Sequence, residues 1–155
     1  MSYKKILWTT DGSENSLSSL PTAVSLAKTF QARLYDLHVV ARVPMLSKNG
    51  FTPPAPMSFD VPRYEQELIE KMKKYLEKTI SAYSSELPAV ENVVEVGDPA
   101  ETIINFAQRN EVELIIMSTH GRKGIKHMIL GSVAENVIRH SPVAVLTEPS
   151  AKKSK

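Results

Sequence analysis

The feature that most constrains the fold of this chain is a regular alternation of strand-like and helix-like patterns. Short apolar runs rich in strand-forming residues predict five β-strands, over residues 3–10, 32–40, 91–97, 112–118 and 142–148. Apolar residues at helical spacing predict helices between them, within residues 13–30, 64–83, 98–110 and 131–141. This alternation indicates an α/β fold, an open parallel sheet with helices on both faces and right-handed crossovers.

The expected helix starts differ in their local chemistry. Asp98 has the properties of an N-cap, Pro99 suits the first helical position, and Glu101 completes a capping box. The helix expected from Ser13 contains Pro21, which lacks a backbone N–H and would kink or delay that helix.

The length of the chain fits one folded domain. At 155 residues we expect a single domain over residues 1–148, followed by a flexible, polar and basic tail at 149–155. Within the domain, residues 41–62 carry five prolines and one glycine. A loop of this length in a small domain is usually functional or mobile, so we interpret it as a flap or a partner-binding loop.

Composition excludes several classes of function. The chain has no cysteine, which excludes a disulfide scaffold, a thiolate zinc site and a cysteine nucleophile. Its 19 Lys and Arg against 17 Asp and Glu give a formal charge of +2, too small to call for a nucleic-acid partner. No apolar run approaches the roughly 18 residues that a membrane span needs, and the N-terminus does not resemble a signal peptide. We therefore expect a cytoplasmic protein with neither a nucleic-acid nor a membrane partner.

Two loops follow expected strands and carry residues suited to an anionic ligand. They are "TTDGS" at 9–13 and "STHGRKGIKHMILGS" at 118–132. In sheets of this kind ligands bind at the carboxyl ends of the strands, where the strand order reverses. Gly121 and Gly131 would let the backbone approach phosphate oxygens, and Ser132 lies at a helix N-terminus, which favours an anion. The second loop adds positive charge from Arg122, Lys123, Lys126 and His127.

Each of these features also has an explanation without a ligand. Ser132 and Glu135 fit the S-x-x-E capping box, and Asp11 could either bind a ribose hydroxyl or cap the first helix. His120 suits a local hydrogen bond as well as a role as a base. Neither the G-x-x-x-x-G-K-[ST] motif nor the G-x-G-x-x-G motif occurs, so these two phosphate-binding modes are disfavoured.

Four segments in order carry a resemblance to a known family: "KILWTTDGSENS", "LYDLHVV", "VGDPAETI" and "LIIMSTHGRKGIKHMILGSVAENVIRHSPVAVLTE". Over nearly its whole length the chain resembles the universal stress protein family. ATP-binding members carry G-x-x-G, nine residues, and then G-[ST]. Here Gly121, nine residues, Gly131 and Ser132 match the second half, while Ser118 stands at the first glycine position. Serine is small and its hydroxyl can face a ligand.

The resemblance implies a Rossmann-like sheet of the adenine nucleotide alpha hydrolase type, in strand order 3-2-1-4-5. It also implies a homodimer joined along the last strand, 142–148. An apolar edge strand left unpaired is an aggregation hazard, which gives pairing along this strand an independent physical motive.

By position, the resemblance assigns each nucleotide contact to a residue of this chain. Thr10 and Asp11 would touch the adenosine half, Val39 would meet adenine through its backbone, and Met117 would pack nearby. The ribose and phosphates would be lined by Ser118, His120, Gly121, Gly131, Ser132 and Val133.

The leading hypothesis is therefore a dimeric stress-response regulator that binds ATP together with Mg²⁺. The alternatives are a dimeric interaction protein without a nucleotide, and a protein that binds AMP or cyclic AMP. The sequence shows neither paired carboxylates in a metal-binding arrangement nor a nucleophile with an evident base. We expect binding without a dedicated catalytic residue, with slow ATP hydrolysis at most.

Overall fold

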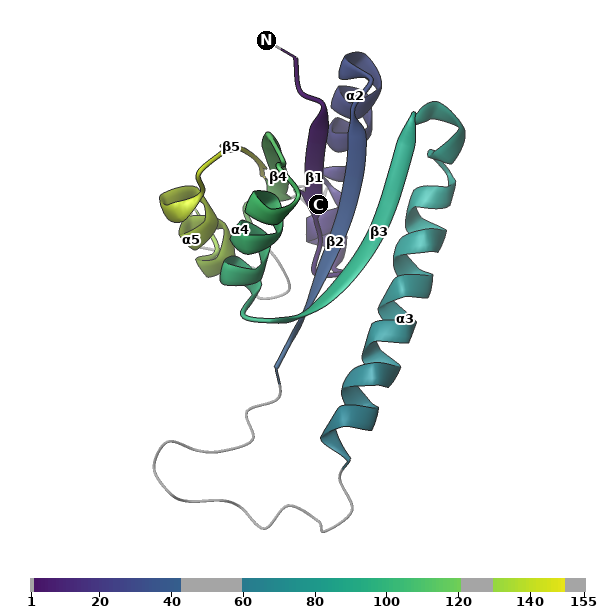
Figure 1. The fold of residues 1–155 in the computed structure, drawn as a ribbon, viewed down its shortest axis with the longest axis vertical. Helices are drawn as coiled ribbons and strands as arrows, with labels where there is room; N and C mark the ends of the chain where they lie inside the picture. Colours follow the sequence, from purple (N-terminus) through teal and green to yellow (C-terminus); the bar gives the residue numbers. More distant parts are fainter. Residues whose placement is uncertain (1, 43–59, 121–129, 150–155) are drawn as a thin grey trace, which may run out of the picture.

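The computed structural model describes residues 2–42, 60–120 and 130–149, which form a five-stranded parallel sheet with helices on both faces (Figure 1). The strand order is β3-β2-β1-β4-β5, and all four neighbouring pairs are parallel. The strands are β1 (Lys5–Thr9), β2 (Arg33–Ala41), β3 (Ala89–Gly97), β4 (Leu114–Ser118) and β5 (Ala144–Glu148). The predicted fold class and strand order are confirmed.

The helices divide between the two faces of the sheet (Figure 1). They are α1 (Glu14–Leu17), α2 (Leu20–Phe30), α3 (Val61–Ser81), the short 3₁₀ helix η1 (Ser84–Glu86), α4 (Pro99–Arg109) and α5 (Ser132–His140). Buried residues of α2 and α3 share one apolar cluster with the sheet. Buried residues of α4 and α5 share a second cluster on the opposite face.

The chain after β1 forms two helices where the sequence predicted one, so that prediction was wrong in this detail. Ser13 caps the short α1, because its side chain accepts a hydrogen bond from the amide of Ser16. Pro21 lies in the first turn of α2, where a missing N–H breaks no helical bond. The proline therefore delays the second helix without kinking it.

The predicted start of α4 is confirmed. Asp98 is the N-cap, and its Oδ1 accepts a hydrogen bond from the amide of Glu101 at 3.0 Å. Asp60 caps α3 in the same way, accepting from the amide of Arg63 at 3.1 Å. Because β2 ends at Ala41 and α3 begins at Val61, both ends of the predicted loop 41–62 belong to regular elements. Residues 43–59, with the role proposed for them, and the tail from residue 150 lie outside the described residues.

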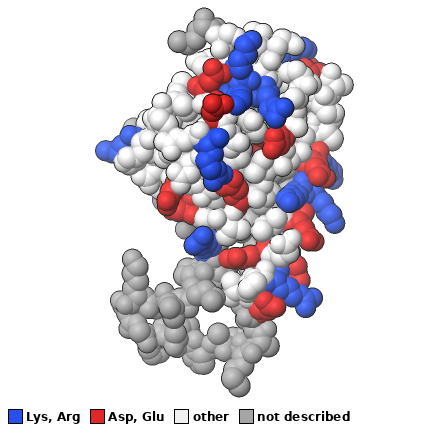
Figure 2. All heavy atoms as spheres, viewed as in Figure 1, with Lys and Arg blue, Asp and Glu red and all other residues white. Residues whose placement is uncertain are grey.

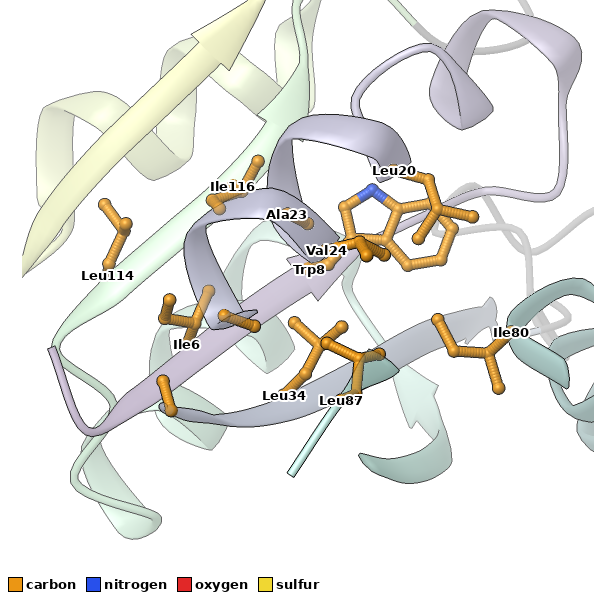
Figure 3. Packing of buried hydrophobic residues seen from close by; sticks show 12 residues of the cluster. Ile6, Trp8, Leu20, Ala23, Val24, Leu34, Ile80, Leu87, Leu114 and Ile116 are labelled. Atoms are coloured by element: carbon orange, nitrogen blue, oxygen red, sulfur yellow. The ribbon is translucent and has the colours of Figure 1, made fainter. Parts of the chain in front are cut away.

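Alternation along the strands sends successive side chains into the two apolar clusters. Ile6 and Trp8 of β1 belong to the cluster under α2 and α3, whereas Leu7 between them belongs to the cluster under α4 and α5. Figure 3 shows Trp8 packed against Leu20 and neighbouring residues of α2. All three strand residues are completely buried, as the core of a parallel sheet requires.

The surface carries charges of both signs. On the face in Figure 2, Lys and Arg side chains are interspersed with Asp and Glu. Some form exposed pairs, such as Arg139 and Glu135 at 2.8 Å, and such pairs contribute little to stability. In the part of the chain that the structure describes, no helix is both long enough and apolar enough to cross a bilayer.

Candidate functional site

The strand order reverses between β1 and β4. The candidate site is therefore the edge of the sheet formed by the carboxyl ends of the strands, beside β1 and β4. β2 and β3 follow β1 on one side, while β4 and β5 lie on the other. Ile6 pairs with Leu114 and Trp8 with Ile116, so the chain leaves both strands at the same edge. The two loops in which the sequence indicated an anionic ligand therefore start from the same end of the sheet.

Thr10 holds the first loop in place from inside. It is 4% exposed, and its amide donates to the carbonyl of Leu37 at 3.1 Å. Its hydroxyl lies 2.7 Å from Ser16 Oγ and accepts from the amide of Gly12 at 3.0 Å. Its carbonyl lies 2.9 Å from His38 Nδ1, and because a carbonyl can only accept, Nδ1 carries the hydrogen. The side chain of Thr10 is thus committed to the loop itself.

Asp11 comes next and is half-buried at this edge. Its Oδ1 accepts hydrogen bonds from Ser13, from the amide at 3.0 Å and from the hydroxyl at 2.6 Å. Because Ser13 is the residue that caps α1, the alternative that Asp11 itself caps the first helix is wrong. The Tyr75 hydroxyl of α3 donates to the carbonyl of Gly12 at 3.4 Å and ties the helix to this loop. Gly12 has φ 78°, a conformation that favours glycine.

Val39 lies on β2 beyond the point where β1 ends. The β1–β2 ladder stops at the pair Thr9–Leu37, followed by the bond from Thr10 to Leu37. In a parallel ladder, alternate residues point their peptide groups toward the same neighbouring strand, so Val39 points to the β1 side as Leu37 does. Among the described residues no backbone bond from the β1 loop reaches Val39. Its N–H and C=O therefore face the space above the end of β1.

The second loop begins with buried residues that make local hydrogen bonds. Met117 is 5% exposed and belongs to the apolar cluster under α4 and α5, and Ser118 is 7% exposed. Ser118 Oγ donates to the carbonyl of His120 at 2.9 Å, so its hydrogen points along the loop. Thr119 Oγ1 and His120 Nδ1 lie 2.9 Å apart, which agrees with the local hydrogen bond considered for His120.

Gly131 closes the second loop back onto its first residues. Its amide donates to the carbonyl of Thr119 at 2.7 Å. A Cβ on Gly131 would lie 2.9 Å from the same carbonyl oxygen, closer than real Cβ atoms approach. Glycine is therefore required here for the close approach of two backbone segments, with or without a ligand.

The N-terminus of α5 lacks a side-chain cap. Gly131 is the N-cap and Ser132 the first helical residue, so the capping box considered for Ser132 and Glu135 is wrong. The first helical bond runs from the amide of Glu135 to the carbonyl of Gly131 at 2.9 Å. The amides of Ser132, Val133 and Ala134 precede it and have no acceptor within the helix. Such a terminus favours an anion.

Gly121 and the basic residues 122, 123, 126 and 127 lie outside the described residues. Of the predicted nucleotide contacts, the structure brings two groups to the same edge of the sheet. One group comes from β1 and β2 and the other from β4 and α5, and the members are Thr10, Asp11, Val39, Met117, Ser118, His120, Gly131, Ser132 and Val133.

Sequence reasoning did not predict the contacts of Glu148, the last residue of β5. The carbonyl of Glu148 accepts from the amide of Thr119 at 2.8 Å, and its carboxylate accepts from the hydroxyl of Thr22 on α2. Glu148 therefore joins the second loop, β5 and α2. No local pattern predicts this, because 126 residues separate Thr22 from Glu148.

Comparison with known proteins places the chain in a family. The model of the universal stress protein family matches residues 2–147. The chain belongs to the universal stress protein family. The resemblance inferred from the sequence is thereby confirmed, over nearly the whole chain.

Relatives agree with this assignment. Universal stress protein MJ0531 of Methanocaldococcus jannaschii is 36% identical over 154 residues, which cover 95% of this chain and 84% of the relative. The solved structure of MJ0577, a universal stress protein of the same organism, is similar with a TM-score of 0.77 and 29% identity, over 99% of this chain and 100% of that one. A universal stress protein in complex with cAMP has the same fold, with a TM-score of 0.69, 20% identity and coverage of 97% and 100%.

Proposed function

We propose that this universal stress protein binds an adenine nucleotide, ATP in the first place, at the edge of the sheet where β1 and β4 end. The observation that carries the proposal is the uncapped N-terminus of α5, whose first amides lie at this edge together with Asp11 and the backbone of Val39. A solved neighbour with this fold holds cAMP, which supports an adenine nucleotide as the ligand class.

The groups at this edge match the parts of a nucleotide in order. Peptide N–H and C=O groups, as at Val39, are complementary to the hydrogen-bonding edge of adenine. The carboxylate of Asp11 can accept from a ribose hydroxyl with lone pairs left over from its bonds to Ser13. The amides of Ser132 and Val133 would donate to phosphate oxygens. Thr10 would touch the adenosine half and Met117 would pack near adenine, while Ser118, His120, Gly121 and Gly131 would line the ribose and phosphates.

Mg²⁺ would accompany the triphosphate mainly through phosphate oxygens and water. The described residues contain no group of three or more His, Asp and Glu side chains that could hold a metal by themselves. Mg²⁺ characteristically keeps several waters and binds to substrate phosphates, so a dedicated protein cage is not required. The proposed role is binding, in which nucleotide occupancy regulates the protein during stress.

We also propose that the protein is a homodimer joined along β5. β5 is the last strand in the sheet order, and the carbonyl of Glu148 points to β4 because it accepts from Thr119. By alternation, the N–H and C=O groups of Val145 and Thr147 point away from β4, toward the unpaired outer side of β5. A second copy can pair with these groups and cover the edge.

The ligand is tested by calorimetric titration of the purified protein with ATP, ADP, AMP and cyclic AMP, with and without Mg²⁺. We expect ATP to bind more tightly than AMP, because the additional phosphates meet the N-terminus of α5. The absence of heat and of any shift in melting temperature with all four ligands would contradict the proposal. Binding of AMP or cyclic AMP in preference to ATP would support an adenine nucleotide site but contradict the proposal that the ligand is a triphosphate.

The position of the phosphates is tested at Ser132, which is exposed. Ser132→Glu adds a negative charge at the N-terminus of α5, where it stabilises the helix but repels phosphate. We expect ATP affinity to fall by about tenfold or more, as a repulsion of roughly 1.4 kcal/mol implies, while the melting temperature does not fall. Ser132→Gln is the matched uncharged control and should lose much less affinity. Equal affinity in the two variants would show that the phosphates lie elsewhere.

A further inference from the structure

Asp36 is an ionisable side chain placed inside the apolar core. It lies in the middle of β2, paired with Trp8 of β1 on one side and Asn92 of β3 on the other. Alternation places it on the same face as Leu34, in the cluster under α2 and α3. Asp36 is 0% exposed, and neither of its carboxyl oxygens has a hydrogen-bond partner. A buried charge without a partner is strongly unfavourable.

A second buried oxygen without a partner lies on the neighbouring strand. Asn92 Oδ1 is buried and accepts no hydrogen bond. Asn92 is the register partner of Asp36, and paired residues in a sheet project to the same face with their Cβ atoms about 5 Å apart. A carboxyl group and an amide oxygen at this spacing are within reach of each other. With the Asn92 amide oriented as it is, all three unsatisfied atoms are acceptor oxygens, so the space between them lacks a donor hydrogen.

We infer that Asp36 and Asn92 form a buried proton-binding pair, in which Asp36 is a neutral carboxylic acid that donates its hydrogen to Asn92 Oδ1. The proton supplies the missing donor and removes the buried negative charge in one step. One hydrogen bond then satisfies an oxygen on each strand. This inference does not depend on nucleotide binding.

The surroundings of Asp36 favour the neutral acid. Burial raises the pKa of Asp36 to about 7 from an ordinary value of 3.8. Basic side chains near this face are engaged elsewhere: His38 Nδ1 bonds to the carbonyl of Thr10, and Lys28 of α2 pairs with Glu86 at 3.0 Å. On β1 and β3 the register partners, Trp8 and Asn92, do not ionise near neutral pH.

Other ionisable groups on this side, within the described residues, are tyrosines and Glu148, whose carboxylate accepts from Thr22 of α2. Tyr3 and Tyr83 pack against the cluster, and Tyr75 of α3 donates to the carbonyl of Gly12. His38 is the imidazole on this face among the described residues, so the experiment must separate its contribution from that of Asp36.

The pair makes folding stability depend on pH in a definite direction. Because the pKa of Asp36 is raised on folding, the folded protein binds one proton more than the unfolded chain between pH about 4 and about 7. This contribution to stability is complete below pH about 4 and is lost as the pH rises through about 7. Across this window the unfolding equilibrium constant should rise by about tenfold per pH unit from this one group.

The proton is tested directly by carbon NMR of protein labelled at the aspartate carboxyl groups. The sequence has four aspartates, so four signals are expected, and Asp36→Asn identifies one of them by its loss. We expect that signal to titrate near pH 7. A midpoint below pH 5 for all four signals would overturn the inference.

The stability linkage is tested by unfolding at several pH values. Asp36→Asn replaces the neutral acid by a side chain of the same shape, so the tenfold change per pH unit should disappear from this variant while any contribution of other groups stays. Asp60→Asn is the matched control, because Asp60 is exposed and asparagine also caps a helix. An unchanged slope in Asp36→Asn would overturn the inference, as would a stability that depends on Na⁺ or K⁺ at constant ionic strength, since a bound cation would then replace the proton.

The assignment of Asn92 as acceptor has its own readout. The infrared carbonyl band of a protonated carboxyl group moves to higher frequency when its O–H loses a hydrogen-bond acceptor. Asn92→Ala should therefore raise the frequency of the band that Asp36→Asn removes. An unmoved band would show that Asp36 donates to another group.

Discussion

The small polar side chains that are buried behind the first loop form hydrogen bonds with other side chains and with backbone carbonyls. Trp8 Nε1 donates to Ser19 Oγ at 2.9 Å, and Ser19 Oγ donates to the carbonyl of Ser16 at 3.0 Å. Ser16 in turn donates to the carbonyl of Ser13 at 2.8 Å. This chain of bonds contrasts with Asp36, whose oxygens meet no donor. The buried serine hydroxyls thus have hydrogen-bond partners, whereas the buried oxygens of Asp36 have none.

The bond to the indole leads to a prediction for Ser19. Ser19→Ala leaves a fully buried N–H of Trp8 without an acceptor, so it should lower the free energy of unfolding by about 1–3 kcal/mol. Ser18→Ala is the control, because Ser18 is less buried and its hydroxyl bonds only to the carbonyl of Asn15. Chemical denaturation of both variants measures the difference. Equal losses would show that the indole bond adds nothing beyond a local turn contact.

The sequence determines some residue roles and conceals others. Asp98, Pro99 and Glu101 act within one helical turn, so the pattern predicts the start of α4 correctly. The role of Gly131 depends on the carbonyl of Thr119, twelve residues earlier, and no local rule predicts that contact. The same limit applies to Ser19, since its partner Trp8 lies on another element.

At the scale of the elements, the sequence predicted the local cap of α4 but not the equally local cap that Asp60 provides for α3. Ser19 is the N-cap residue of α2 but makes no side-chain cap, because its hydroxyl is engaged with Trp8 and Ser16. α5 has a glycine N-cap, which offers no side chain at all. α4 has the complete local arrangement, so its cap provides the clearest measurement.

Asp98→Ala should destabilise the protein by about 1 kcal/mol, because the amide of Glu101 loses its acceptor at the start of α4. Asp98→Asn keeps an acceptor oxygen and should lose only a small part of this. Thermal or chemical unfolding of the two variants checks the prediction. A loss in Asp98→Asn as large as in Asp98→Ala would assign the effect to charge and not to capping.

The candidate site shows the same division between local and distant information. The residues of both loops, and the glycine pattern of the second, identified this region, and the sheet order brings the two loops to one end of the sheet. The hydrogen bonds that fix the site were not predictable, because they join Thr10 to Leu37 and His38, and Glu148 to Thr119. These contacts exist only once the strands are paired.

At the scale of the whole molecule, β5 is an edge strand of the sheet, and the outer side of its backbone has no neighbouring strand in the described chain. Thr147→Pro removes an N–H that points away from β4, so it spares the β4–β5 ladder. In the proposed symmetric dimer each copy would lose one donor, about 2 kcal/mol in total, and the dissociation constant should rise roughly thirtyfold. Sedimentation over a range of concentrations measures this change.

Thr147→Val is the matched control for that experiment, because it keeps the N–H and nearly the same shape. The far-ultraviolet circular dichroism of both variants should match that of the unaltered protein, which separates loss of pairing from loss of fold. A dimer of undiminished strength in Thr147→Pro would place the contact between copies elsewhere on the molecule.

The bond from the carbonyl of Glu148 to the amide of Thr119 has a consequence for regulation. It attaches the start of the second loop to the strand on which the dimer is proposed to form. Ordering either one restrains the other, so occupancy and self-association would be thermodynamically linked. By reciprocity, the factor by which the nucleotide strengthens association equals the factor by which association strengthens nucleotide binding.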